Sequence, residues 1–562
     1  MLAIVDTPWV DGLTIGEVLS RTVRDQGSRD AVVFPRLNLR WSYGEFFDRV
    51  KQTARAFMAL GVEPGDHIGI WSTNWPEWIL AQFASAHIGA VLVNVNPAYR
   101  VHEMEFILAA ADIKWLLLTD AFKHSNYEDM IATLIPELAT TPFGKPLALE
   151  RFPSLRQVVS IKPAPSKPGI WPWGEFMAQA SRIHEADLAR RAAACNYRMP
   201  ANIQYTSGTT GQPKGATLTH RNLLMNAFHV GSRQRMGSAD RLCIPVPFYH
   251  CFGCVMGTLM CAVHGAAMIV PAESFEPESV LEAVEKERCT ALYGVPTMFN
   301  AELNHPDFDQ YELSTLRTGI MAGSPCPVEL MKHVTHFMHL SELTIAYGLT
   351  ESSPVITQSE TSEPIEVRVS TVGTVLPGVE VRIVDPKTLN DMPDGEPGEL
   401  WSRGHGTMLG YYKDPEATAK VVTPDGWLRT GDLAVRMPSG HYRITGRLKD
   451  MIIRGGENIY PREIEEFLLT HPKIYDVQIV GVPDMHYGEQ VSAWIIPKDP
   501  SLTEDEVRAF CKGHIAHYKI PHYIEFIQDF PLTVSGKIQK FKLREAGIEQ
   551  FGLRNIAGTE TA

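Results

Sequence analysis

The sequence predicts an α/β protein with at least two domains, and three observations lead to this prediction. The first two thirds of the chain alternate short apolar runs with helical segments, as buried parallel strands joined by helices do. After about Thr371, valines and glycines at short spacing indicate a small β subdomain. The chain has 562 residues, which is too long for one hydrophobic core.

The elements follow in chain order. Helices around a short hairpin are expected over residues 13–57, with strands at 32–34 and 39–42. Buried strands are then expected at residues 67–71, 90–95, 115–119 and 201–205. Asn74 is expected to cap a helix over 76–86. Residues 136–194 carry several prolines and weak periodicity, which predicts an excursion over the surface.

The middle of the chain continues the same pattern. A helix is expected after His220, and the most apolar stretch, 254–270, is interrupted by His264 and Gly265. That stretch is short for a membrane span, so it predicts a buried helix, a turn and a strand. Further elements are expected at 268–270, 277–286, 291–293, 316–321 and 343–347.

The C-terminal part differs in pattern. The β subdomain is expected to run to Ile444 with one helix at 415–419. From about Met451 a separate small domain is expected. Its elements are expected at 461–469, 476–480, 491–496 and 504–516.

Composition narrows the function. A net charge of −13 without long charged blocks argues for a soluble acidic protein and against a nucleic-acid-binding one. The N-terminus has neither a signal-peptide nor a transit-peptide pattern, and no integral membrane segment is expected. Eight scattered cysteines indicate reduced thiols in a cytoplasm. Cys251 and Cys254 form a C-x-x-C without a zinc or redox context, so they are expected to line a pocket.

One stretch cannot belong to a core. Residues 205–215 read YTSGTTGQPKG, which combines glycines, hydroxyls and Lys214. Glycines allow close approach of the backbone to a ligand, and amides, hydroxyls and a cation suit a polyphosphate. The alternative is an ordinary polar loop. A Walker A loop is excluded, because Lys214 follows a proline and precedes a glycine.

This stretch resembles, nearly residue for residue, the phosphate-binding motif of the adenylate-forming superfamily, which includes acyl-CoA synthetases, luciferases and peptide-synthetase adenylation domains. Other stretches resemble further motifs of that superfamily in the same order. They are MAGSP at 321–325, YGLTE at 347–351, WLRTGD at 427–432, YRITGRLKD at 442–450, RGGEN at 454–458 and PLTVSGKI at 531–538.

The resemblance implies a large N-terminal adenylation domain over 1–446, a hinge over 447–450 at Lys449, and a small mobile α+β domain over 451–562. The ATP and AMP contacts that it implies are Thr206, Ser207, Gly208, Thr209, Thr210, Gly211, Lys214, Gly323, Ser324, Pro325, Ala346, Tyr347, Gly348, Thr350, Asp432, Arg447 and Lys537.

Particular roles follow from the resemblance too. Tyr347 would contact adenine, Asp432 and Arg447 would bind the ribose, and Lys537 would stabilise the transition state. The catalytic set is Lys537, Thr350, Glu351 and His250, and the Mg²⁺ ligands are Glu351 and Thr206. The residues alone allow simpler readings: Glu351 as an acid in a first helical turn, Asp432 as a turn cap, and Lys537 as an inert surface lysine.

The acid is expected to be bound near residues 245–253. No aspartate lies at 248–251, where amino-acid-activating members usually carry one, and the segment after Cys251 is apolar. This favours a fatty or aryl acid. Gly253 and Gly257, one helical turn apart, are expected to leave room beside the helix for a chain. By resemblance the acyl pocket contains His250, Phe252, Val295 and Met321, although His250 also reads as a satisfied core histidine.

The expected function is that of a cytoplasmic ATP-dependent fatty-acyl-CoA synthetase, most like medium-chain acyl-CoA ligases. CoA would bind at Gly455, Gly456 and Glu457, and Mg²⁺, ATP and CoA are the implied cofactor and co-substrates. An aryl-CoA ligase of the benzoate or cinnamate type, an acyl–carrier-protein ligase and a silent binding protein are the alternatives. Chain length, pathway and oligomeric state stay open, with a homodimer among the options.

Overall fold

A computed structural model describes residues 7–141, 144–162, 165, 167–206, 213–324, 326–455, 457–532 and 538–557. Two compact units are present. Unit 1 extends to Val381 and includes Ser402–Leu428, and unit 2 comprises Arg382–Trp401 and continues from Arg429. The predicted α/β class, with a small β subdomain and a smaller C-terminal unit, is confirmed. The domain division with a hinge at 447–450 stays a prediction.

The first sheet of unit 1 has eight strands in the order β21-β11-β10-β4-β3-β5-β8-β9. Their bounds are β3 His67–Trp71, β4 Val91–Val95, β5 Ile113–Leu118, β8 Gln157–Ser160, β9 Ile170–Pro172, β10 Pro200–Thr206, β11 Lys214–Thr219 and β21 Gly410–Tyr411. Strands β3, β4 and β10 confirm the buried apolar runs, and they pair in parallel. The expected surface excursion over 136–194 was partly wrong, because all four residues of β8 are buried and pair with β5.

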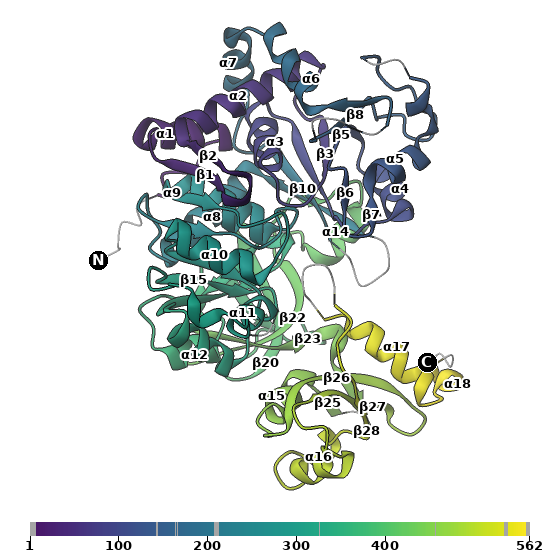
Figure 1. The fold of residues 1–562 in the computed structure, drawn as a ribbon. Coiled ribbons are helices and arrows are strands. Elements are labelled where there is room, and N and C mark those ends of the chain that lie inside the picture. The colour runs from purple at the N-terminus through teal and green to yellow at the C-terminus, as the bar shows by residue number, and fades with distance from the viewer. Residues whose placement is uncertain are drawn as a thin grey trace. The chain divides into compact units, whose positions relative to one another are not determined.

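The helices between residues 15 and 193 lie around this sheet and its neighbouring hairpin (Figure 1). They are α1 Ile15–Gln26, α2 Tyr43–Ala59, α3 Pro76–His87, α4 Val101–Ala110, α5 Tyr127–Leu134, α6 Trp173–Ala178 and α7 Glu185–Ala193. The expected cap of α3 was wrong. Its N-cap residue is Trp75, with no capping side chain, and Asn74 bonds instead to the backbone of a distant loop.

The second sheet of unit 1 has nine strands in the order β18-β17-β16-β15-β14-β12-β13-β1-β2. Their bounds are β1 Asp30–Phe34, β2 Leu39–Ser42, β12 Arg241–Cys243, β13 Ala267–Ile269, β14 Ala291–Gly294, β15 Thr318–Ala322, β16 Glu342–Gly348, β17 Val355–Gln358 and β18 Thr374–Val375. Strands β12, β14, β15 and β16 are parallel neighbours. A short hairpin, β6 Ala121–Phe122 and β7 Ser125–Asn126, stands apart.

The remaining helices of unit 1 include three that follow one another along this second sheet: α10 Pro277–Glu287, α11 Pro296–Leu303 and α12 Val328–Phe337 (Figure 1). The others are α8 His220–Arg233, α9 Met260–His264, α13 Ile365–Ser370 and α14 Pro415–Val421. The start of α8 is set by a reciprocal capping box between Thr219, which precedes the helix, and Asn222 in its first turn.

The apolar stretch before β13 begins with a π-helix, Phe252–Leu259, and continues as α9 to a left-handed turn at Gly265 with φ 72°. The predicted order of helix, turn and strand is confirmed. The reason given for its glycines was wrong. A Cβ at Gly253 would lie 2.3 Å from the Pro247 carbonyl oxygen, so Gly253 serves close backbone packing rather than space for a ligand. Gly257 faces Ile244, whose Cγ2 would lie 3.2 Å from a Cβ.

Unit 2 contains most of a four-stranded sheet, β19-β20-β22-β23, and all of a five-stranded sheet. The bounds are β19 Val379–Val384, β20 Pro397–Gly404, β22 Leu428–Arg436, β23 Tyr442–Arg447, β24 Ile452–Arg454, β25 Glu457–Ile459, β26 Ile474–Asp484, β27 Gly488–Pro497 and β28 Tyr523–Phe526. Its helices are α15 Pro461–Leu468, α16 Glu504–Cys511, α17 Lys540–Gln550 and α18 Arg554–Ala557. The helix expected to reach residue 516 ends at Cys511, shortly before Gly513 with φ 80°.

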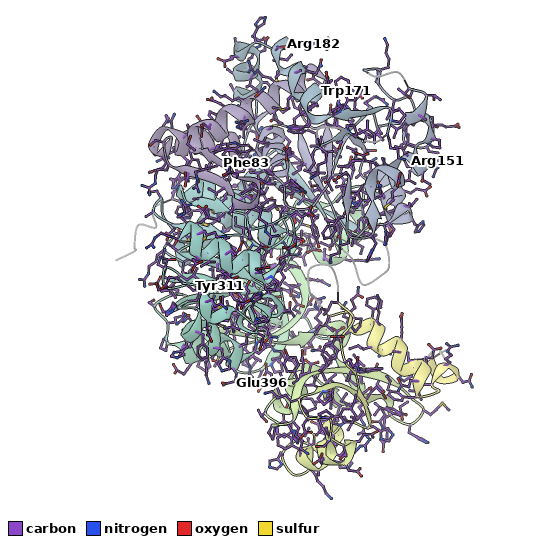
Figure 2. All side chains as sticks on the ribbon, viewed as in Figure 1. Phe83, Arg151, Trp171, Arg182, Tyr311 and Glu396 are labelled. Carbon is purple, nitrogen blue, oxygen red and sulfur yellow. The ribbon has the colours of Figure 1, made fainter. Side chains whose placement is uncertain are left out.

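Each unit has its own apolar core. In unit 1, Phe83 is buried against Phe46, whereas Arg151 and Arg182 lie at the surface (Figure 2). No helix in the described part of the chain is long and apolar enough to cross a membrane.

Candidate active site

Three parallel strands bring the predicted nucleotide and acyl residues together. In the register of β14, β15 and β16, Gly294 lies beside Met321, and Ala322 lies beside Ala346. The three strands end at Gly294, at Ala322 and at Gly348. Ligands of α/β proteins bind at the carboxyl ends of such strands. Two of the sequence motifs, at 321–325 and 347–351, therefore meet the predicted acyl residue Val295 at one edge of the second sheet.

Two glycines at this edge are required by the backbone. Gly323 has φ 92°, a conformation that other residues rarely adopt, and a Cβ there would also lie 3.1 Å from Val295 Cγ1. At Gly348 a Cβ would lie 1.8 Å from the Pro354 carbonyl oxygen. The chain after β16 thus turns back tightly, and this turn leads into a short helix, Thr350–Ser352.

Glu351 is held at this turn by a segment that sequence reasoning did not identify. Its Oε1 accepts a hydrogen bond of 2.8 Å from the hydroxyl of Tyr411, and its backbone oxygen accepts one of 2.9 Å from the amide of Met408. Burial raises the pKa of Tyr411, and the neighbouring carboxylate raises it further, so the phenol stays protonated and donates. The only signal in the sequence is an aromatic pair after Gly410.

The predicted phosphate loop connects β10 to β11. Thr206 and Lys214 are directly opposed in this antiparallel pair, and the Thr206 hydroxyl lies 3.4 Å from the Lys214 carbonyl oxygen. Lys214 Nζ lies 5.5 Å from the ring centroid of Tyr411. Tyr411 therefore contacts both the cation of the phosphate loop and the carboxylate of Glu351. Residues Ser207, Gly208, Thr209, Thr210 and Gly211 lie outside the described residues.

Glu351 at this edge and Thr206 at the end of β10 in the other sheet carry oxygen groups that fit the Mg²⁺ implied by the sequence motifs. Glu351 supplies a largely buried carboxylate whose orientation is fixed by Tyr411, and Thr206 supplies a hydroxyl. Mg²⁺ prefers oxygen ligands and is usually bound through one or two protein groups together with substrate phosphates.

His250 lies next to the same edge. The amide of Phe252 donates to His250 Nδ1 at 3.2 Å, so in the neutral ring the proton is on Nε2. Cys251 Sγ lies 3.6 Å from His250 Nδ1 and 3.8 Å from the hydroxyl of Thr350. Cys251 thereby joins the histidine of the acyl segment to the threonine of the nucleotide motif. That Cys251 lines a pocket stays a prediction.

The predicted acyl residues divide between two faces of the second sheet. Phe252, Val295 and Tyr293 belong to one apolar cluster, with the rings of Phe252 and Tyr293 5.4 Å apart. Met321 packs on the other face among Met331 and Leu343. The structure does not bring Met321 together with Phe252, because alternate residues of a strand point to opposite faces. Its neighbours Ile320 and Ala322 lie on the Phe252 side.

In unit 2, the two residues expected at the ribose contact each other. Asp432 on β22 is directly opposed to Arg447 on β23, and Arg447 Nε lies 3.2 Å from Asp432 Oδ1. The turn before Asp432 is fixed by the buried Glu399, whose Oε1 accepts from the amide of Gly431 at 3.0 Å. A carboxylate beside a guanidinium offers an acceptor and several donors for ribose hydroxyls.

The expected hinge and CoA residues also lie in unit 2. Lys449 follows β23 in a short helical turn, and burial lowers its pKa. Gly455, with φ 59°, forms the turn between β24 and β25, and its amide donates to the Tyr487 carbonyl at 2.8 Å. Glu457, which opens β25, is exposed. Pro325, Gly456 and Lys537 lie outside the described residues.

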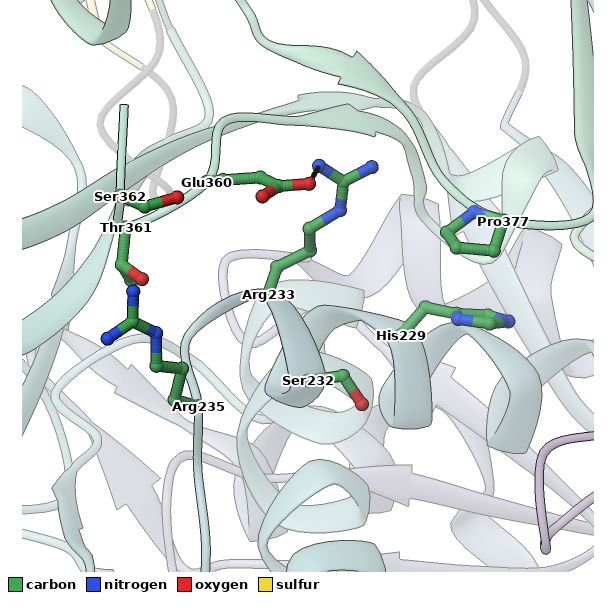
Figure 3. Close-up of a pocket in the computed structure, with 8 residues that line it drawn as sticks. All are labelled: His229, Ser232, Arg233, Arg235, Glu360, Thr361, Ser362 and Pro377. Carbon is green, nitrogen blue, oxygen red and sulfur yellow. Dashed lines mark hydrogen bonds and ion pairs between the residues drawn. The ribbon is translucent and has the colours of Figure 1, made fainter. Parts of the chain in front are cut away.

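A separate cavity of about 210 Å³ lies beside the C-terminal end of α8 (Figure 3). The Arg233 side chain crosses it to Glu360, at 2.6 Å, and also donates to Thr374 Oγ1 and the Val375 carbonyl. Desolvation lowers the pKa of the lining His229 to about 4, so this ring is neutral near pH 7. The cavity contains none of the predicted site residues.

Comparison with known proteins decides the family. Residues 19–412 match the AMP-binding enzyme family, and residues 463–537 match the AMP-binding enzyme C-terminal domain. The chain belongs to the AMP-binding enzyme family. The resemblance to adenylate-forming proteins is therefore confirmed.

Relatives cover nearly the whole chain. A protein of Bacillus subtilis (strain 168), provisionally named as the acyl-CoA synthetase YngI, is 52% identical over 541 residues, which is 96% of this chain and 98% of the relative. The Danio rerio protein named medium-chain acyl-CoA ligase ACSF2, mitochondrial, is 43% identical over 545 residues, or 96% of this chain and 89% of the relative.

Solved structures share the fold. ATP-bound MatB from Rhodopseudomonas palustris is 26% identical, with a TM-score of 0.79 over 96% of this chain and all of MatB (100%). The anthranilate CoA ligase AuaEII is 24% identical, with a TM-score of 0.82 over 95% of this chain and 97% of AuaEII. The AMP-binding enzyme fold expected from the motifs is thus confirmed.

Proposed function

We propose that this AMP-binding enzyme is a fatty-acyl-CoA synthetase that acts on medium-chain acids. The coarser activity, ATP-dependent ligation of a carboxylic acid to CoA through an acyl-adenylate, follows from its family and from relatives named as acyl-CoA synthetases and ligases. The medium-chain assignment is supported by the name of the zebrafish relative and by the apolar side chains around Phe252.

One observation carries the proposal: Cys251 contacts both His250 and Thr350. The segment expected to bind the acid is therefore adjacent to the motif expected to bind the phosphates of ATP. A general nucleotide-binding protein has no need of a protonated imidazole nitrogen at this position. In an adenylating enzyme, the Nε2–H of His250 can donate to a carboxylate of the acid and orient it toward the α-phosphate.

In the first half-reaction, a carboxylate oxygen attacks the α-phosphorus of ATP, and the bond from that phosphorus to pyrophosphate breaks. Lys214 and the hydroxyl of Thr206 would bind phosphate oxygens beside Glu351. Mg²⁺ held by Glu351 and Thr206 would neutralise phosphate charge. Lys537 would add a cation at the pentavalent phosphorus, where such charges act most strongly.

In the second half-reaction, the CoA thiolate attacks the acyl carbon and AMP leaves. We assign the ribose of the nucleotide to Asp432 and Arg447, which already form an ion pair. The turn at Gly455 and Gly456, with Glu457, is assigned to CoA. Lys449 is assigned as the hinge about which the small domain would rotate between the two half-reactions.

We place the enzyme in the cytoplasm, in keeping with eight free cysteines.

The class of acid that the enzyme activates distinguishes a fatty-acyl-CoA synthetase from an aryl-CoA ligase and from an amino-acid-activating enzyme. No aspartate lies at residues 248–251, where amino-acid-activating members usually carry one to bind the amino group, so an amino acid is disfavoured. An aryl acid remains a second candidate, because Phe252 and Tyr293 are aromatic. Pyrophosphate release with a panel of short to long fatty acids, benzoate and cinnamate tests the substrate. Omission of CoA, or its replacement by a carrier protein, tests the acceptor.

A further inference from the structure

The segment that presents His250 is held by side chains of the other sheet. It runs from Pro245 to His250, between β12 and the π-helix, and Asn74 binds it at two points. Asn74 Oδ1 accepts from the Phe248 amide at 2.8 Å, and its Nδ2 donates to the Val246 carbonyl at 3.1 Å. Asn74 follows β3 of the eight-stranded sheet, so it joins the two sheets of unit 1 at this segment.

A second asparagine reaches the residue next to His250. Asn94 on β4 donates from Nδ2 to the Tyr249 carbonyl at 3.0 Å. This carbonyl belongs to the peptide bond between Tyr249 and His250. Because Asn94 is only 3% exposed, water cannot replace this bond easily. The position of the His250 backbone therefore depends directly on the amide of Asn94.

The amide of Asn94 is oriented in turn by two residues of β10. Its Oδ1 accepts from Asn202 Nδ2 at 2.9 Å, and Asn202 Oδ1 accepts from Gln204 Nε2 at 2.7 Å. In the parallel register Gln204 lies beside Asn94. Gln204 is two residues before Thr206, where the predicted phosphate loop begins. The donors in this chain all point the same way, from the strand of the phosphate loop toward Tyr249.

The same side chains contact the π-helix that follows His250. Cys254 Sγ lies 3.4 Å from Gln204 Nε2 and 3.7 Å from Asn94 Nδ2. Buried amides are costly without partners, and apolar residues would fill this space with less risk to stability. A set of amides that donate to one another in one direction specifies one arrangement of the loop instead. We call Asn94, Asn202 and Gln204 the amide chain.

We propose that Asn94 is a positioning residue that sets the place of His250 for the acid, and that Asn202 and Gln204 act on His250 through Asn94. This inference rests on the proposed function, since His250 is there the group that orients the carboxylate. The new element is a link between the acid site and β10, the strand that leads into the phosphate loop, through the hydrogen bonds of Asn202 and Gln204. Mutations of Gln204 should therefore change the KM for the acid, although Gln204 reaches the loop of His250 only through the neighbouring strand β4.

The test compares Asn94→Asp with Gln157→Glu in the full-length enzyme. Asn94→Asp keeps the acceptor for Asn202 and, once its carboxyl is ionised, replaces the donor to Tyr249 with an oxygen, so the constants are measured at the alkaline end of the wild type's stable pH range. Gln157→Glu removes a similar buried donor, which reaches the Lys145 carbonyl at 3.2 Å in another part of the same sheet. We expect Asn94→Asp to raise the KM for the acid on the order of tenfold in ATP–pyrophosphate exchange. The Kd of ATP without acid should change less than about twofold, and Gln157→Glu should leave both constants near wild type.

The coupling is tested by Gln204→Glu and by the double variant. Gln204→Glu should raise the KM for the acid in the same direction, because an oxygen then faces Asn202 Oδ1 and disturbs the Asn202 amide. The double variant should show less than the product of the two single effects, as expected for residues in one network. Circular dichroism and the thermal midpoint of each variant establish that it is folded. Should Asn94→Asp not fold, Asn94→Ser replaces it.

Several results would overturn the inference. The first is a folded Asn94→Asp variant whose KM for the acid is unchanged, or which loses ATP binding and acid binding equally. The second is a Gln157→Glu variant whose effects are as large as those of Asn94→Asp. The third is a double variant whose KM for the acid rises by the full product of the two single effects. Failure of the proposed function looks different, because the wild-type enzyme would then activate no fatty or aryl acid at all.

Discussion

The hydroxyl of Tyr411 donates a 2.8 Å hydrogen bond to Oε1 of Glu351, across sixty positions of sequence. The strand of Tyr411 pairs with β11, in which Tyr411 lies beside Ala216, so the phenol is fixed by the same strand that begins at Lys214. This arrangement links the proposed metal ligand to the proposed phosphate loop. Groups that bind a metal ligand from outside commonly fix its orientation and tune its affinity.

Tyr411→Phe should therefore weaken Mg²⁺ binding more than ATP binding. The variant keeps the ring under Lys214 and removes only the hydrogen bond to Glu351. We expect the free Mg²⁺ concentration for half-maximal pyrophosphate release to rise about fivefold to tenfold. Titration of Mn²⁺ into the enzyme with a nonhydrolysable ATP analogue, followed by electron paramagnetic resonance, should show the same loss.

Tyr412→Phe is the matched control, because Tyr412 donates a similar bond of 2.7 Å to Asp112. It should leave the Mg²⁺ dependence unchanged. Equal shifts in the two variants would contradict the orientation of Glu351 by Tyr411 and indicate a general loss of packing.

Gly253→Ala should impair the enzyme, and Gly257→Ala should not. A Cβ at residue 253 would collide with the Pro247 carbonyl and displace the segment that leads to His250. Ile244 can yield to a Cβ at residue 257 by a small shift of its side chain. We expect Gly253→Ala to lower the free energy of unfolding by about 1–3 kcal/mol and to raise the KM for the acid. If Gly257→Ala were the more damaging of the two, the packing described for the π-helix would be wrong.

A buried carboxyl predicts an unusual dependence of stability on pH. Glu302 on α11 is fully buried, neither of its oxygens has a hydrogen-bond partner in the described structure, and burial raises its pKa well above its ordinary value. The folded state therefore retains a proton that the unfolded chain loses above about pH 4.5. Stability contributed by this group is lost as the pH rises above that value, by up to about 1.4 kcal/mol per pH unit.

Glu302→Met should consequently raise the thermal midpoint at pH 7, with a gain that grows between pH 5 and pH 8. The exposed Glu278 on the neighbouring α10 provides the control Glu278→Met, whose effect on the thermal midpoint should vary little with pH. A pH-independent effect of Glu302→Met would mean that this carboxyl is ionised in the folded protein and paired in a way not described above.

Arg447→Gln tests the ribose assignment in unit 2. Loss of the guanidinium leaves Asp432 without its ion pair and removes donors for the ribose hydroxyls. We expect the KM for ATP to rise on the order of tenfold while the KM for the acid stays within about twofold. The control is Arg443→Gln, an exposed residue of the same strand. An equal rise in both KM values for Arg447→Gln would count against the assignment.

The sequence predicted the fold where local pattern and burial agree. Strand β3 was predicted over its full length, because an apolar run between turn residues is the direct signature of a buried strand. Strand β8 was missed, since its four buried residues lie within a proline-rich stretch with little periodicity. Asn74 was taken as a helix cap because the local rule is strong, but its partners Val246 and Phe248 are contacts that only the tertiary structure provides.

The site was predictable to a similar extent. The motifs at Gly323 and at Tyr347–Glu351 were grouped by their resemblance to one family, and the structure brings them together because the parallel strands before them end at one edge of the sheet. Met321, assigned to the acyl pocket by resemblance, packs in a different apolar cluster from Phe252, and a motif does not show the face because neighbouring residues of a strand alternate. Tyr411 had no motif of its own, and its importance depends on a partner far away in sequence. Nothing in the sequence indicates a π-helix after His250 rather than an α-helix.

The central claim is tested most directly by acid-dependent ATP–pyrophosphate exchange and CoA-dependent AMP formation, measured for the wild type and for Lys537→Ala. The wild type should be most active with medium-chain fatty acids, and thioester should form only when CoA is present. Lys537→Ala should lose exchange yet still form thioester from supplied acyl-adenylate. The account would be contradicted if the wild type catalysed exchange with amino acids, or if none of the acids in the panel supported exchange. Equal loss of both half-reactions in Lys537→Ala would contradict it too.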